Sequence, residues 1–100
     1  MEKDKKPQAK GMRLKISDPI MRGAYANSMM VSHTKEEFIL DFINAFPPEA
    51  TVNARIITSP GHLKRLVGTL QQNLAKYESK FGPIQEASSP DDQKTDEYIM

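Results

Sequence analysis

Apolar positions recur most regularly near the C-terminal end of the chain, where they have the period of a helix. Ser59 is a preferred N-cap residue, and Pro60 stands at the first helical position, where its missing N–H costs nothing. Gly82, followed by Pro83, is typical of a helix end. The pattern therefore predicts a helix over about residues 60–81.

The large apolar side chains of this predicted helix form one narrow stripe. They follow each other at steps of four and three residues, a spacing that keeps one face of a helix against a partner. The stripe consists of Leu63, Val67, Leu70, Leu74, Tyr77 and Phe81. It predicts a long packing surface, either within one chain or between two copies.

Three other segments have the pattern of strands. Residues 12–17 alternate apolar and polar side chains, which is typical of a half-buried strand. Residues 24–32 have two fairly apolar or small faces, which favours an inner strand. Residues 51–59 are rich in β-branched side chains and give the clearest strand prediction. An Asp-Pro pair and a glycine between the first two predict a short connection there.

The segment between the second and third predicted strands fits two structures. Thr34 and Glu37 have the spacing of a capping box, and apolar residues then follow at helical spacing until two prolines. In the same segment, residues 38–43 alternate in a way that fits a strand, and most of them are good strand formers. The pattern by itself leaves helix and strand open.

Composition and charge define one small domain with two polar tails. A chain of 100 residues with 38% hydrophobic content has room for one core. Residues 1–10 carry four basic and two acidic side chains, whereas residues 84–100 carry one basic and five acidic ones. We expect a disordered basic arm over residues 1–10, a folded domain over 11–84 and a disordered acidic tail over 85–100.

The residue inventory argues against most kinds of chemistry. The chain has no cysteine and only two histidines, which excludes disulfides and argues against a closed structural zinc site. Its five glycines are scattered and form no phosphate-binding loop. The N-terminal residues lack the apolar stretch of a signal peptide, and no segment is apolar enough to cross a bilayer. We therefore expect a cytoplasmic protein with no cofactor.

Few single residues are candidates for a functional site. His33 and His62 have no recognisable nucleophile or carboxylate partner, so we interpret both as turn or surface residues. Asp41 is the one charge inside an apolar run, where a buried carboxylate would have a shifted pKa. We favour an outward-facing Asp41 that pairs with Arg55 across the sheet. The sequence therefore predicts a protein that is not an enzyme.

Basic side chains offer a second kind of candidate site. They would lie on the flanks of the helix and on the strands, where they could form a surface for a polyanion. The candidates are Arg13, Lys15, Arg55, Lys64, Arg65, Lys76 and Lys80. No RNA- or DNA-binding signature accompanies them.

Three short motifs are specific enough to compare with known families: the Glu-Phe-Ile-Leu-Asp-Phe run at 37–42, Arg55-Ile56-Ile57 before Ser59-Pro60, and Tyr77-Glu78 before Phe81-Gly82. Through them the chain resembles, between residues 12 and 84, a bacterial family of small domains, the domain of unknown function family 3467. It implies a sheet with a helix and favours a strand around residues 37–42. Residues 43–48 depart from the family pattern, so we expect this strand to end early or to turn helical after Asp41.

Together these patterns predict an α+β domain. Three or four antiparallel strands would form a meander, and one long C-terminal helix would lie across the sheet or against its counterpart in a second chain. We expect a non-catalytic module for oligomerisation or for binding an unidentified protein, most simply a homodimer that packs through the distal half of the helix. A monomer in which residues 42–46 cover that end of the helix is the alternative structure. A nucleic-acid-associated protein is the alternative function.

Overall fold

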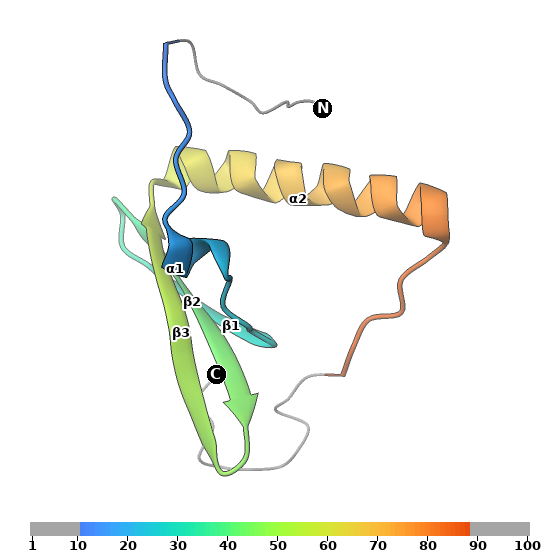
Figure 1. The fold of residues 1–100 in the computed structure, drawn as a ribbon, viewed down its shortest axis with the longest axis horizontal. Helices are drawn as coiled ribbons and strands as arrows, with labels where there is room; N and C mark the ends of the chain where they lie inside the picture. The colour runs from blue at the N-terminus through green and yellow to red at the C-terminus, as the bar shows by residue number, and fades with distance from the viewer. Residues whose placement is uncertain (1–10, 89–100) are drawn as a thin grey trace.

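The structure is a computed structural model that describes residues 11–88, and it has one sheet and one long helix (Figure 1). Along the chain the elements are α1 (Asp18–Met21), β1 (Ser28–His33), β2 (Phe38–Phe46), β3 (Glu49–Thr58) and α2 (Pro60–Phe81). The three strands form an antiparallel meander in the order β1-β2-β3. The predicted α+β class and the long C-terminal helix are confirmed. The predicted basic arm, residues 1–10, and residues 89–100 of the tail predicted over 85–100 lie outside the described residues.

The ambiguous segment is a strand, and its capping-box residues form a turn. The Thr34 hydroxyl accepts hydrogen bonds from the backbone N–H groups of Glu36 and Glu37, both at 3.2 Å, and Thr34 N–H donates to the Glu37 carbonyl. A threonine side chain satisfies backbone donors in this way at a helix start and in a tight turn alike. The same local signal here closes the hairpin between β1 and β2.

β2 continues through residues 43–46, where the departure from the family pattern predicted an end or a helix. Its last residue, Phe46, pairs with Glu49, and the hairpin to β3 turns at Pro47 and Pro48. The expectation that this strand ends or becomes helical after Asp41 is therefore wrong. Residues 42–46 also do not cover the distal end of the helix, as the alternative monomer packing requires, because Leu74, Tyr77 and Phe81 there remain about half exposed or more.

The described core is centred on β2. Leu40, Ile43 and Ala45 are its buried apolar residues, with at most 4% of their surface exposed. Of the strands in residues 11–88, only β2 has a hydrogen-bonded neighbour on both sides, so its side chains are enclosed by those of two strands. β1 and β3 are edge strands, and the prediction that residues 24–32 form an inner strand is wrong.

Two asparagines attach the chain to the sheet just before β1. The side chain of Asn27 accepts a hydrogen bond from Ala45 N–H at 2.8 Å and donates to the Ala45 carbonyl at 3.1 Å. The side chain of Asn53 donates to the Tyr25 carbonyl at 2.7 Å. Asn53 lies at the irregularity where the β2–β3 register shifts, between the partners of Phe42 and Ile43. The side chains of Asn27 and Asn53 thus take the place of backbone hydrogen bonds between strands. For this reason β1 starts later than predicted.

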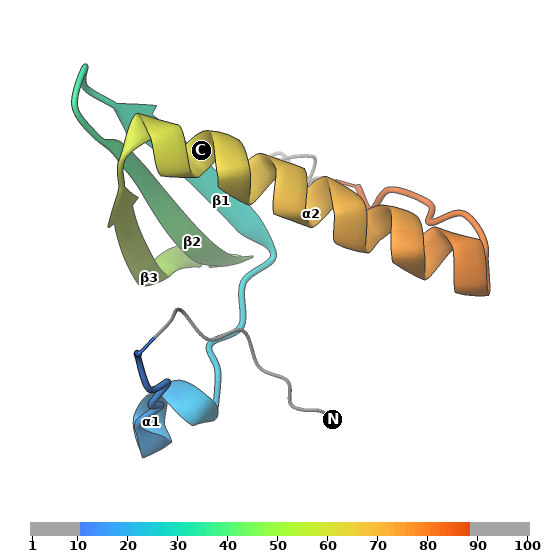
Figure 2. The same cartoon turned by 90° about the horizontal axis from the view of Figure 1, so that it is seen from above.

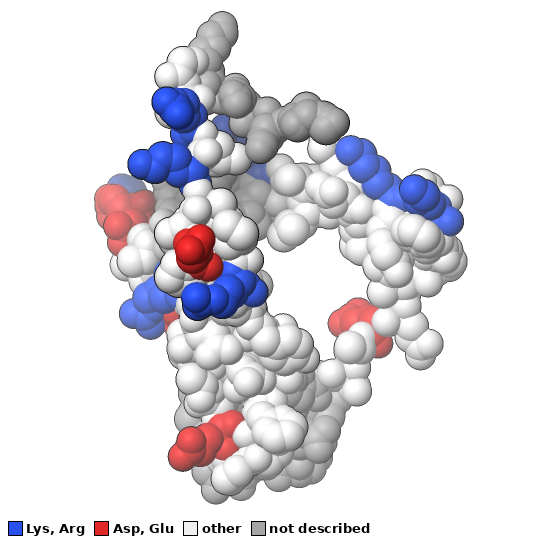
Figure 3. Space-filling model, viewed as in Figure 1, with Lys and Arg blue, Asp and Glu red and all other residues white. Residues whose placement is uncertain are grey.

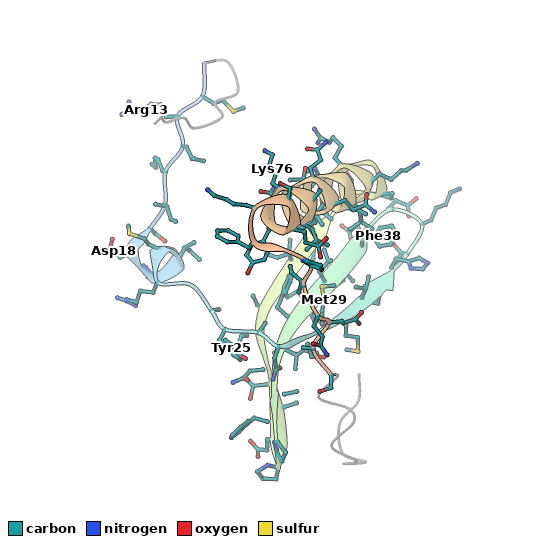
Figure 4. All side chains as sticks on the ribbon, turned by 90° about the vertical axis from the view of Figure 1, so that its right-hand side faces the viewer. Arg13, Asp18, Tyr25, Met29, Phe38 and Lys76 are labelled. Carbon is teal, nitrogen blue, oxygen red and sulfur yellow. The ribbon has the colours of Figure 1, made fainter. Side chains whose placement is uncertain are left out.

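Residues 12–17 form no strand within the chain. They run extended before α1, and Met12, Leu14 and Ile16 are all more than half exposed. Figures 2 and 4 place this N-terminal segment, with the labelled Arg13 and Asp18, away from the sheet and from α2. A strand needs a ladder partner, and among residues 11–88 this segment has none. The strand prediction for residues 12–17 is wrong for the single chain.

α2 has the bounds that its capping signals predicted. The Ser59 hydroxyl accepts a hydrogen bond from His62 N–H at 3.2 Å, which satisfies one free donor of the first turn. At the other end Gly82 has φ +96°, a backbone region that favours glycine, and its N–H donates to the Glu78 carbonyl at 2.9 Å. Local chemistry therefore fixes both ends of α2.

Candidate interaction site

Most of the apolar stripe on α2 is exposed. Leu63 in the first turn is half-buried, but Val67, Leu70, Leu74, Tyr77 and Phe81 have 44%, 62%, 49%, 50% and 67% of their surface exposed. No residue of α2 is buried. We call these last five residues the α2 stripe.

The direction of α2 explains why the stripe is uncovered. Only one residue separates β3 from α2, so the helix begins at one end of the sheet. From there it runs outward past the strands, and a space-filling view shows an opening between its far end and the sheet (Figures 1 and 3). A helix of 22 residues is about 33 Å long. The closely packed pairs of elements in the described chain are β1 with β2 and β2 with β3, and α2 belongs to neither.

The far end of the stripe is aromatic. The rings of Tyr77 and Phe81 lie 4.9 Å apart at 47°, and the Lys80 ammonium lies 5.7 Å from the centre of the Phe81 ring. The chain then turns back, because Ile84 N–H donates a 2.9 Å hydrogen bond to the Glu78 carboxylate. Aromatic side chains that are exposed and pack against each other are among those that contribute most binding energy at protein interfaces.

A stable interface needs more surface than the α2 stripe offers. The five side chains of the stripe are each about half exposed. At about 150 Å² of surface for a large side chain, their exposed surface adds up to on the order of 400 Å². A patch of that size marks an interaction site in many soluble proteins. A stable interface buries about 800 Å² on each partner, so a partner that covers the stripe must also cover other surface.

Asp41 is buried and pairs with Arg55. The pairing agrees with the prediction from the sequence. Arg55 Nε and Nη2 donate to the two carboxylate oxygens at 2.7 and 3.0 Å, and the two residues are direct partners across β2 and β3. The predicted outward-facing position is wrong, because the Asp41 side chain is only 5% exposed while that of Arg55 is 61% exposed. The guanidinium covers the carboxylate and keeps its own outer edge in water.

The hydrogen bonds from Arg55 keep the Asp41 carboxylate ionised. Arg55 lowers the pKa of Asp41 from 3.8, chiefly through the side-chain hydrogen bonds and also through its positive charge, against the opposing effect of burial. Asp41 therefore stays ionised at neutral pH and has both oxygens engaged. This arrangement ties two strands together and leaves no free base for acid–base chemistry at Asp41.

The two histidines lie in separate places. The ring of His33 lies 5.1 Å from that of Phe38, its cross-strand partner at the β1–β2 hairpin. His62 lies in the first turn of α2, where its Nδ1 is 3.0 Å from the Arg65 guanidinium. Among the described residues no three His, Cys, Asp or Glu side chains converge to hold a metal ion.

The basic candidates do not converge on the visible face of the molecule. Figure 3 shows one group of blue side chains on the side of the N-terminal segment and another, separate group over the far part of α2. Arg55 is occupied by Asp41, and Arg65 by His62. Arg13 and Lys15 belong to the segment before α1, whereas Lys64, Lys76 and Lys80 belong to α2.

Sequence reasoning missed the two asparagines that organise the entry into the sheet. Asn27 and Asn53 were placed within predicted strands, where an asparagine has no special role. The signal that could have found them is that asparagine is a poor strand former whose side chain readily bonds backbone groups. Their roles are structural, so the α2 stripe remains the feature with a functional implication.

Comparisons with known proteins identify the family and nothing more specific. No curated protein matches the chain, and no solved structure matches it. No helix in the part of the chain that the structure describes is long and apolar enough to span a membrane. One family model, described as protein of unknown function (DUF3467), matches residues 1–86, which is most of the chain. With its three-stranded meander and long C-terminal helix, the chain belongs to the DUF3467 family.

Proposed function

We propose that this protein is a non-catalytic oligomerisation module that forms a homodimer through the α2 stripe. The observation that carries the proposal is a stripe at 3.5-residue spacing that stays exposed over four turns of a helix that extends beyond its own sheet. Leu70, Leu74, Tyr77 and Phe81 would pack against the helix of the second copy. A second copy is the partner that such a repeat fits most directly, because it carries the complementary spacing itself.

The nucleic-acid alternative has less support. A polyanion site needs free basic side chains on one surface, and the guanidinium of Arg55 is already bound to Asp41. The remaining candidates are divided between the N-terminal segment and α2. The apolar surface, by contrast, is continuous along one helix.

Light scattering on the full chain tests the homodimer. The wild type should have twice the chain mass of 11.3 kDa, and Leu74→Asp should have that mass once. A carboxylate buried without a partner costs several kcal/mol, and about 3 kcal/mol already raises the Kd more than a hundredfold. Circular dichroism should show that Leu74→Asp keeps its secondary structure, since Leu74 is half exposed in the single chain.

Gln72→Asp is the matched control. Gln72 lies two residues from Leu74 on the opposite side of α2 and is exposed, so the same carboxylate there should leave the dimer intact. A wild type that is monomeric at high micromolar concentration would refute the proposal. So would a dimer that Leu74→Asp and Gln72→Asp affect equally.

A further inference from the structure

The N-terminal segment has the sequence pattern of a strand but no ladder partner among residues 11–88. Residues 12–17 alternate Met12, Leu14 and Ile16 with polar side chains, and these three apolar residues are 62%, 68% and 56% exposed. Just after them, Ser17 has the extended backbone angles φ −80° and ψ 159°. An extended segment with period-two alternation has the backbone and the side-chain pattern for adding to a sheet edge.

β3 offers an open edge that fits such a segment. It has ten residues, contains no proline, and among the described strands has a ladder partner only in β2. Val52, Ile56 and Ile57 on this strand are about half exposed, at 51%, 48% and 55%. A long edge of this composition tends to pair with another strand unless something covers it. The other edge strand, β1, has six residues.

The path of the chain brings the segment to the β3 side but not onto β3 of its own sheet. The Asn53 side chain holds the Tyr25 carbonyl next to β3, and the preceding residues then lead away through α1. Figures 2 and 4 both show α1 and the segment before it on the β3 side of the sheet and apart from it. In a twofold pair whose β3 edges face each other, each segment would project toward the sheet of the other copy.

We propose that residues 12–17 of each copy add as an outer strand to the β3 edge of the other copy. This inference rests on the proposed homodimer and names a second part of its interface. Main-chain hydrogen bonds would continue the sheet, and Met12, Leu14 and Ile16 would cover exposed side chains of β3. The exchange also supplies surface that the α2 stripe lacks, because the stripe alone provides about half of the roughly 800 Å² that a stable interface buries on each partner.

Single-cysteine variants of the full chain test this exchange, because the protein has no cysteine of its own. Lys15→Cys places a thiol on the polar side of the segment, and Thr51→Cys places one on β3. Ser32→Cys on β1 is the matched control at the opposite edge, and both strand positions are exposed. The Lys15→Cys chain, labelled with ¹⁵N, is mixed with each unlabelled strand variant, treated with a short bismaleimide and analysed by mass spectrometry.

The labelled and unlabelled chains should cross-link when the second variant is Thr51→Cys and should not when it is Ser32→Cys. Leu14→Pro removes a ladder donor from the segment and should raise the Kd of the dimer about tenfold or more, without changing the circular dichroism. A dimer in which Lys15→Cys links to Ser32→Cys, or to neither strand, overturns the strand exchange and leaves the homodimer standing. A double variant, Lys15→Cys with Thr51→Cys, provides a second check. If its two cysteines cross-link only within one chain, the strand exchange is overturned too. A monomeric wild type overturns both proposals.

Discussion

The same substitution, leucine to alanine, should have different effects in the core and on the α2 stripe. Leu40 on β2 is 4% exposed, whereas Leu70 on α2 is 62% exposed. Truncating a buried leucine removes its transfer free energy and leaves a cavity, which costs about 2–5 kcal/mol. A single core in a domain of this size rarely supplies more than about 3–5 kcal/mol, so Leu40→Ala should leave much of the protein unfolded at 25 °C.

Leu70→Ala should instead have an effect that depends on protein concentration. In the single chain an exposed substitution changes the free energy of unfolding by roughly 0.5 kcal/mol or less. In the proposed dimer it removes an interface contact, so its stability loss appears only where the wild type is dimeric. Urea titrations followed by circular dichroism, at low and at high micromolar concentration, measure both variants.

Two outcomes would refute this reasoning. If Leu70→Ala destabilises a dilute, monomeric sample as much as Leu40→Ala does, then the stripe packs within its own chain. If Leu40→Ala costs less than about 1 kcal/mol, then the core is not centred on β2.

Two further predictions concern the ion pair and the helix. Arg55 lowers the pKa of Asp41 from 3.8, so the ion pair contributes fully to the free energy of unfolding above pH 3.8 and loses this contribution as the pH falls through the lower pKa of the folded state. Asp41→Asn should therefore remove this part of the acid sensitivity in urea titrations from pH 7 downward. An unchanged pH profile would contradict the prediction. Gly68→Ala should raise the free energy of unfolding by about 0.5–1 kcal/mol, because Gly68 is inside α2, a Cβ there meets nothing within 4 Å, and glycine is a poor helix former; thermal melts should show a rise of several °C, and a fall in the melting temperature would contradict it.

What could be predicted from the sequence depends on how far away the partners of a residue lie. Thr34 and Glu37 show the limit of a local signal, because the same hydrogen bonds serve a helix start and a hairpin turn. Residues 38–43 pair with a strand on each side and residues 44–46 continue the pairing with β3, and a short window of sequence does not show these partners. Asp41 shows the same limit for a single residue: its partner Arg55 was predictable from strand alternation, but its burial depends on the packing around β2.

The sequence by itself determined the elements whose signals are local. Ser59, Pro60 and Gly82 fix the ends of α2 within one turn of the helix, and a run of β-branched side chains favours a strand at β3. The tertiary structure decided which patterned segments found a partner. Residues 12–17 have the alternation of a strand and the α2 stripe has the spacing of a packing face, yet both are exposed in the single chain. The reason is that periodicity places apolar side chains on one face of an element. What packs against that face depends on the path of the chain and on which other surfaces lie within reach.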